Sequence, residues 1–144
     1  MIIENFKDFP HAGRLIGIDP GARRVGIAVS DVSREYTFTR PQIMVSGMSG
    51  AIDEIIKIIS DDNIKGIVIG LPLRMDGTES DTTKMVRDFA NDLADKTDVP
   101  IVFIDETLTS SAASEITKDK KELDSIAAKI ILENSIAMIQ RAKK

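Results

Sequence analysis

The chain has 144 residues, a length that suits one domain with its own hydrophobic core. Its 42% hydrophobic and 29% charged residues are typical of a soluble globular protein rather than a disordered or fibrous one. The absence of cysteine excludes disulfides, thiolate catalysis and cysteine-bound zinc. No apolar run approaches the roughly 18 residues of a membrane span, and Glu4 and Asp8 interrupt any signal-like start, so we expect a cytoplasmic protein that does not enter the membrane.

The formal net charge of −4 counts mildly against a nucleic-acid partner, because proteins that bind nucleic acid are more often basic. A local basic rim can still hold phosphates, and clustered metal-binding carboxylates would themselves lower the net charge. The charge alone therefore leaves such a partner open.

The first part of the chain predicts a tail and then three strands. We expect residues 1–13 to be an N-terminal tail and residues 14–144 to form the domain. Apolar runs at 14–19 and 25–31, joined by a turn rich in proline and glycine, predict an antiparallel hairpin. A third strand is expected over 41–46, where the initial proline suits a strand entry or a sheet edge.

Helices and buried strands alternate in the rest of the chain. Isoleucines spaced i, i+3, i+4 and i+7 predict an amphipathic helix at 50–61. Runs rich in β-branched residues predict buried strands at 64–70 and 100–105. The other expected elements are a loop at 71–78, helices at 79–96, 109–117 and 124–141, and a charged loop at 118–121. This order predicts an α/β fold with a mixed five-stranded sheet flanked by helices.

Acidic residues stand where two of the predicted core strands end. Asp19 ends the first strand and Asp105–Glu106 end the fifth, so parallel strands would bring these acids to one edge of the sheet. Asp124, at the start of the last predicted helix, could join them. Crowded carboxylates repel one another unless a cation neutralises them, and their hard oxygens suit Mg²⁺ or Mn²⁺. Such a site fits phosphodiester hydrolysis.

Each acid also has an ordinary structural interpretation. Asp19 could begin the turn at Pro20, a role that aspartate favours. Asp105 could be the ligand in place of Glu106, because a shift of one residue reverses the face of a strand. Asp124 could be only a helix N-cap. Glu106 could also be only an exposed acid after the strand, but we prefer it to Asp105 as the ligand.

Four sequence blocks resemble one known family. They are DPGARRVGIA (19–28), GLPLRMDGTE (70–79), DETLTSSAA (105–113) and DSIAAKIIL (124–132). In this order they are similar to the YqgF/RuvX family, whose members are described as pre-16S rRNA nucleases or Holliday junction resolvase-like proteins. The resemblance implies an RNase H-like fold, a divalent metal and a part in maturing the 5′ end of 16S rRNA. The family's acidic residues correspond to Asp19, Glu106 and Asp124.

Two positions depart from the family pattern. Thr107 stands where the family usually has arginine, which removes a cationic partner for phosphate or carboxylate. Arg74 stands where the family often has asparagine, and arginine suits bidentate contact with phosphate. The candidate nucleic-acid contacts are Arg24, Arg74, Lys118, Lys120 and Lys121, each of which could instead be a solvated surface residue.

The leading hypothesis is a metal-dependent nuclease that acts on precursor rRNA. A branched-DNA resolvase would share the chemistry but needs paired sites, and hence a dimer with two-fold symmetry. A non-catalytic module in ribosome assembly is the third alternative, which Thr107 keeps open. We expect a monomer or a weak homodimer.

Overall fold

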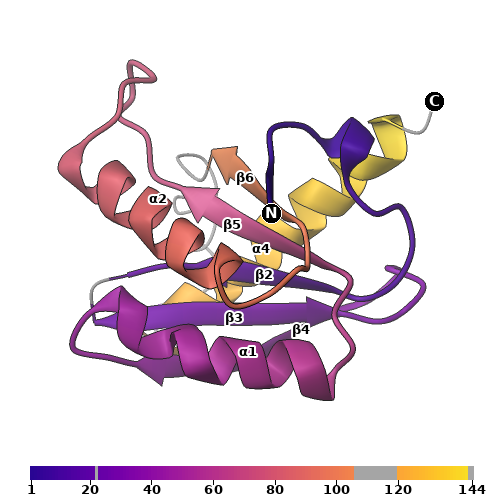
Figure 1. Cartoon of the computed structure of the whole chain (residues 1–144), viewed down its shortest axis with the longest axis horizontal. Coiled ribbons are helices and arrows are strands. Elements are labelled where there is room, and N and C mark those ends of the chain that lie inside the picture. Colours follow the sequence, from indigo (N-terminus) through magenta and orange to yellow (C-terminus); the bar gives the residue numbers. More distant parts are fainter. Residues whose placement is uncertain (22, 106–119, 143–144) are drawn as a thin grey trace.

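A six-stranded mixed sheet organises the chain in a computed structural model that describes residues 1–21, 23–105 and 120–142, with the backbone alone at 120–124 (Figure 1). The strand order is β1-β6-β5-β2-β3-β4. The strands are β1 (Ile2–Ile3), β2 (Leu15–Asp19), β3 (Arg24–Ser30), β4 (Thr37–Met44), β5 (Gly66–Leu71) and β6 (Ile101–Asp105). The helices are α1 (Ile52–Asp61), α2 (Asp81–Ala94) and α4 (Lys120–Ala142), with short 3₁₀ turns η1 (Phe6–Asp8) and η2 (Met48–Ala51).

The pairing of the strands agrees with the predicted mixed sheet. β2 pairs with β3 and β3 pairs with β4 in antiparallel fashion, which confirms the predicted hairpin. β2, β5 and β6 are parallel neighbours, with β5 in the middle. The sheet has six strands rather than the five expected, because β1 adds to β6.

Residues 1–13, expected to be a tail, take part in the fold. Ile2 and Ile3 form a short strand parallel to β6, a pairing too brief to leave a periodic pattern in the sequence. Phe6 and Phe9 are buried against each other in an edge-to-face arrangement, with ring centroids 5.9 Å apart. These two rings pack in a cluster with side chains of α4.

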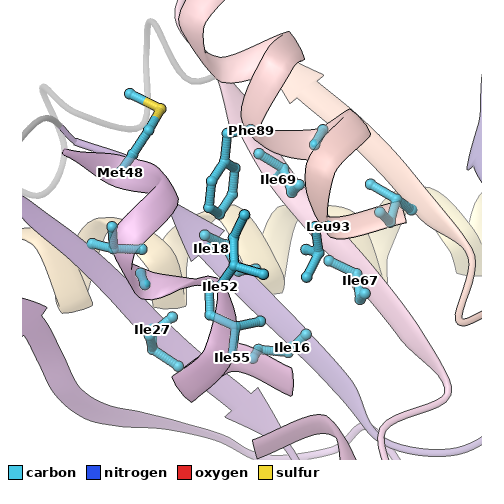
Figure 2. Close-up of a cluster of buried hydrophobic side chains, with 14 of the residues drawn as sticks. Ile16, Ile18, Ile27, Met48, Ile52, Ile55, Ile67, Ile69, Phe89 and Leu93 are labelled. Carbon is cyan, nitrogen blue, oxygen red and sulfur yellow. The ribbon is translucent and has the colours of Figure 1, made fainter. Parts of the chain in front are cut away.

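Helices α1 and α2 cover one face of the sheet (Figure 1). Strand residues that point to this face are mostly isoleucines, and they interlock with the apolar side of both helices, as Figure 2 shows. The labelled members of this cluster are Ile16, Ile18, Ile27, Met48, Ile52, Ile55, Ile67, Ile69, Phe89 and Leu93. The alternation of side chains along β2 and β5 sends the intervening residues to the opposite face.

Helix α4 packs on that opposite face, directly against β2. A Cβ atom added at Gly17 would lie 2.7 Å from the carbonyl oxygen of Ala128 and 2.9 Å from the Cβ atom of Leu132. Only glycine leaves room for so close an approach of helix and strand. Leu15, Val68 and the α4 side chains complete this second cluster. Among the described residues, no helix is long and apolar enough to cross a membrane.

Two segments differ from the sequence-based expectation. β4 begins at Thr37, four residues before the predicted start, and Pro41 lies inside it; an outermost strand tolerates proline because one side of its backbone needs no ladder hydrogen bonds. The predicted charged loop at 118–121 is wrong for Lys120 and Lys121, which form the first turn of α4, since lysine is a good helix former. The predicted helix at 109–117 lies outside the described residues.

Candidate active site

Three parallel strands end at one edge of the sheet, as the sequence predicted. β2 ends at Asp19, β5 at Leu71 and β6 at Asp105. Ile18 pairs with Ile69, and Ile69 pairs with a residue of β6, so the three strands finish at nearly the same level (Figure 1). We call this end of the sheet the carboxyl edge, and it is where open α/β sheets bind their ligands.

Asp19 lies on the face of the sheet that α4 covers. Ile16 and Ile18 belong to the cluster beneath α1 and α2, whereas Leu15 belongs to the cluster beneath α4 and Gly17 touches α4 itself. Because side chains alternate along a strand, Asp19 follows Leu15 and Gly17. Its side chain is half-buried, so its position differs from that of a freely solvated turn residue.

Asp105 lies on the other face. Ile101 and Phe103 pack in the cluster beneath α1 and α2, and Asp105 continues that series two residues further along. Val102 and Ile104 pack with the α4 cluster instead. Asp105 is exposed and does not share a face with Asp19. Glu106, the other candidate at this position, lies outside the described residues.

The beginning of α4 lies near the carboxyl edge. The Ser125 hydroxyl donates a 2.8 Å hydrogen bond to the backbone carbonyl of Arg40 in β4. Arg40 pairs with Ile27 of β3, and Ile27 pairs with Ile18 of β2. The start of α4 is therefore fixed over the row of paired residues that ends at Ile18, and Ile18 directly precedes Asp19.

Residue 124 immediately precedes this hydrogen-bonded serine, and it lies inside the helix. α4 begins at Lys120, so four helical residues come before Asp124. The N-cap interpretation of Asp124 is therefore wrong, because an N-cap stands at the first boundary of a helix. Its side chain, like those of Lys120 and Lys121, is not described, and Lys118 lies outside the described residues.

Arg24 is on the same face as Asp19. Asp19 pairs with Gly26 across the β2–β3 hairpin, and Arg24 stands two residues from Gly26 along β3. Such diagonal neighbours are about 7–8 Å apart, within reach of a long side chain. The turn between the strands is tight, since a Cβ atom on Gly21 would lie 2.5 Å from the carbonyl oxygen of Arg24.

The sequence interpretation missed two β4 residues on this face. Met44 pairs with Arg24, and Gln42 lies across a register shift from Gly26. The Gln42 Oε1 atom is buried and has no hydrogen-bond partner among the described residues, while its Nε2 atom is 4.0 Å from the Met44 sulfur. A polar amide placed between Pro41 and Ile43 in a predicted strand was the signal that could have identified this position.

Arg74 lies on a hairpin that continues from β5 at the same edge. Leu73 and Glu79 form an antiparallel bridge, and the Arg74 N–H donates to the Thr78 carbonyl at 2.9 Å. The Gly77 N–H donates a hydrogen bond to the Arg74 carbonyl at 2.8 Å, and Gly77 has a positive φ of 84°. The guanidinium of Arg74 is exposed at this turn.

The base of this hairpin is attached to α2 and to the sheet. Ser80 caps α2 in a reciprocal capping box with Thr83, and the Thr83 hydroxyl donates to the Pro72 carbonyl. Arg87 of α2 pairs with Glu79 at 2.6 Å, and its guanidinium lies over the Phe103 ring, 5.4 Å from the centroid. Hydrogen bonds, an ion pair and a cation–π contact therefore hold the hairpin in place.

The turn of the hairpin also fixes one carboxylate. The Asp76 carboxylate accepts hydrogen bonds from the Thr78 hydroxyl at 2.6 Å and from the Thr78 N–H at 3.0 Å. The side-chain bond, followed by the backbone bond, holds the pKa of Asp76 below its ordinary value. Among the described residues no group of three potential metal ligands is found.

The structure resembles that of known proteins over nearly its full length. RuvC of T. thermophilus in complex with a Holliday junction substrate superimposes with a TM-score of 0.61 at 13% identity, covering 92% of this chain and 97% of that one. Thermus thermophilus RuvC in another structure gives a TM-score of 0.59, also at 13% identity, and covers 90% and 96%. This likeness places the chain in the class of RNase H-like folds, as the sequence resemblance implied.

Relatives by sequence then define the family. The family model RuvX, described as a Holliday junction resolvase, matches residues 13–138, and the chain belongs to this family. A protein of Orientia tsutsugamushi is 39% identical over 156 residues, covering 99% of this chain and 98% of the relative. One of Maridesulfovibrio salexigens is 39% identical over 132 residues, covering 86% and 98%. Both carry the name "Putative pre-16S rRNA nuclease".

Proposed function

We propose that this protein is a metal-dependent nuclease that hydrolyses phosphodiester bonds of precursor rRNA during maturation of the 5′ end of 16S rRNA. The observation that carries the proposal is the position of Asp19. It ends a central parallel strand at the carboxyl edge, on the face where the start of α4 is fixed. The names of the relatives support the choice of substrate.

In this proposal the second acid is Glu106 rather than Asp105. Asp105 continues the series of Ile101 and Phe103 on the α1 and α2 face, opposite the face of Asp19, which speaks against it as a partner of Asp19. The family resemblance assigns the neighbouring glutamate. Asp124 supplies the third carboxylate from α4. The start of this helix is held to β4 by the bond from Ser125 to Arg40, which pairs with β3.

The donor set fits a hard divalent cation. Three carboxylates supply oxygen ligands only, the type that Mg²⁺ and Mn²⁺ prefer. An ion bound by them would lower the pKa of a water molecule and neutralise charge that develops on the phosphate. Asp19 orients this site from a rigid strand, and Arg24 on the same face would pair with a phosphate oxygen of the substrate.

Further cations would hold the rest of the strand. We propose that Arg74, at the exposed turn of the hairpin, contacts a phosphate beyond the cleaved bond and substitutes in part for the arginine that Thr107 replaces. Lys118, Lys120 and Lys121 would extend the cationic rim near the start of α4. This local rim would allow a chain of net charge −4 to bind a polyanion.

The test is cleavage of a precursor rRNA fragment with its 5′ extension by the purified full chain, in Mg²⁺ or Mn²⁺. We expect Asp19→Asn and Glu106→Gln each to lower the cleavage rate by about 100-fold or more, corresponding to about 2.7 kcal/mol of activation free energy. Asp105→Asn is the matched control and should cleave like the parent. Metal-induced thermal stabilisation should also be measured on the same variants without RNA. If the Asp19 carboxylate binds the ion, Asp19→Asn should lose this stabilisation.

Several outcomes would contradict the proposal. Parent-like cleavage by Asp19→Asn would contradict the assignment of Asp19 as a metal ligand. Loss of cleavage in Asp105→Asn, with cleavage retained in Glu106→Gln, would make Asp105 the ligand in place of Glu106. A parent chain that binds the RNA but never cleaves it would favour a non-catalytic part in ribosome assembly.

Branched DNA is the second candidate substrate, favoured by the family description and by the likeness to a junction-bound RuvC. Resolution of a four-way junction requires two active sites related by two-fold symmetry. Symmetric cleavage of a synthetic junction, together with a dimer in light scattering, would support this alternative, and a monomer under the same conditions would exclude it.

A further inference from the structure

The tip of the β5–α2 hairpin presents a large apolar side chain to solvent. Met75 is 97% exposed, the highest value among the large hydrophobic residues in the described ranges. It occupies the turn between Arg74 and Asp76 and has no core to pack against. Burying a methionine is worth about 1.5–3 kcal/mol, so this position forgoes a gain that a partner could supply.

The turn that carries Met75 has a fixed conformation. Two backbone hydrogen bonds between Arg74 and the residues Gly77 and Thr78 close the turn, and the Asp76 carboxylate is bonded to Thr78 inside it. These contacts fix the turn that carries Met75. A rigid display of one apolar side chain is the geometry of a wedge rather than of a loose loop.

Force on the tip would be transmitted to the core. The hairpin base is joined to α2 through the Glu79–Arg87 ion pair and the Thr83 hydroxyl, and Arg87 lies on Phe103 of β6. The hairpin is thus connected to two of the strands that end at the carboxyl edge. Figure 1 shows the hairpin extending beyond this edge from the end of β5.

One cation of the hairpin, Arg74, can contact a phosphate. The two carboxylates of the hairpin have partners, because Asp76 is bonded to Thr78 and Glu79 is paired with Arg87. Within the part of the chain that the structure describes, no ion pair includes Arg74. A cation therefore stands directly beside the exposed methionine. Arg87 balances the charge of Glu79, whereas Asp76 keeps its negative charge, because its hydrogen bonds to Thr78 do not neutralise it.

We propose that Met75 is a wedge that packs against an RNA base where a stem opens into a single strand, with Arg74 on the adjoining phosphate. Apolar side chains that include methionine insert between base steps in this way, and RNA is recognised mainly where its bases are unstacked. The polarizable thioether adds a favourable contact with the π-face of a base. The wedge rests on the proposed function: it sets which bond of the strand reaches the carboxyl edge.

The experiment uses an RNA stem with a 5′ single-stranded extension that carries 2-aminopurine at the last paired position. Ca²⁺ replaces Mg²⁺, so binding and base unstacking are read without cleavage. The parent chain should raise the 2-aminopurine emission, and Met75→Ala should abolish the rise and weaken binding about tenfold. Met75→Leu should retain both, because it keeps an apolar side chain of similar volume.

Met85→Ala is the matched control, since Met85 is also exposed (48%) but lies on α2. Circular dichroism checks that each variant is folded. If Met75→Ala binds and unstacks like the parent, or if Met85→Ala shows the same loss, the wedge is wrong. The two proposals fail separately on the parent chain: unstacking in Ca²⁺ without cleavage in Mg²⁺ would contradict the nuclease and support the wedge, and cleavage in Mg²⁺ without unstacking in Ca²⁺ would contradict the wedge alone.

Discussion

Gly17 lets β2 and α4 approach so closely that any side chain there must move one of them. The nearest obstacle to an added Cβ atom is the Ala128 carbonyl, which belongs to the helix backbone and cannot rotate away. The position therefore connects the strand that carries Asp19 with the helix that carries Asp124.

We expect Gly17→Ala to lower the free energy of unfolding by about 1–3 kcal/mol, as overpacking of a core does. Urea denaturation would measure the change. Gly47→Ala is the control, because Gly47 has nothing within 4 Å of an added Cβ atom and an extended φ of 178°. Equal stability of the two variants would contradict the close contact of α4 with β2.

The sequence identified Asp19 correctly as the last residue of a buried strand, since apolar runs and breakers mark strand ends well. The preference for Glu106 over Asp105 stays a prediction, because strand periodicity alone does not show which face of β6 each residue takes. That depends on which helices cover which face of β6, and this follows from long-range packing. Gln42 was missed for the same reason, because its burial depends on a register shift between β3 and β4.

The hairpin after β5 is the element whose conformation depends most on its own residues. Asp76, Gly77 and Thr78 make a turn that their own side chains and backbone determine, and the breakers at Pro72 and Gly77 predicted a loop there. The attachment of the hairpin to α2 could not be predicted, since Glu79 and Arg87 meet only once the helix begins at Asp81.

Removal of the Thr78 hydroxyl should change the titration of Asp76. Asp76 has a lowered pKa, so its contribution to stability is present above the ordinary pKa and is lost as the pH falls through the lowered one. In Thr78→Val the pKa should rise part of the way back, because the backbone N–H bond remains. The contribution to stability should therefore be smaller, and its loss should be complete at a higher pH. NMR titration of the Asp76 carboxyl carbon measures this. An unchanged pKa would show that the hydroxyl bond does not form in solution.

For the molecule as a whole, the mixed sheet and its parallel centre were predictable from the alternation of strands and helices. The sixth strand was not, because two isoleucines carry no periodic signal and β1 depends on a partner about one hundred positions away in the chain. The packing of the N-terminal segment against α4 likewise joins the two ends of the sequence, and no local pattern encodes it.

Phe9 tests that long-range contact. It is 2% exposed, and an added Cβ atom on Gly66 would meet its ring at 2.4 Å, so the ring covers β5 directly. We expect Phe9→Ala to cost about 3 kcal/mol of stability in urea denaturation. Phe38→Ala, at a position 52% exposed, should cost far less. A negligible effect at Phe9 would show that the first residues are not part of the core.

Pro41 has a consequence for how molecules of this protein meet. β4 is the outermost strand on its side of the sheet, and an open strand edge invites a neighbour to add its own backbone. Pro41 lacks the donor that such an addition needs, and the irregular register beside it interrupts the spacing of the remaining groups. A second copy therefore finds no unbroken template along β4, and this edge of the sheet discourages edge-to-edge pairing between molecules.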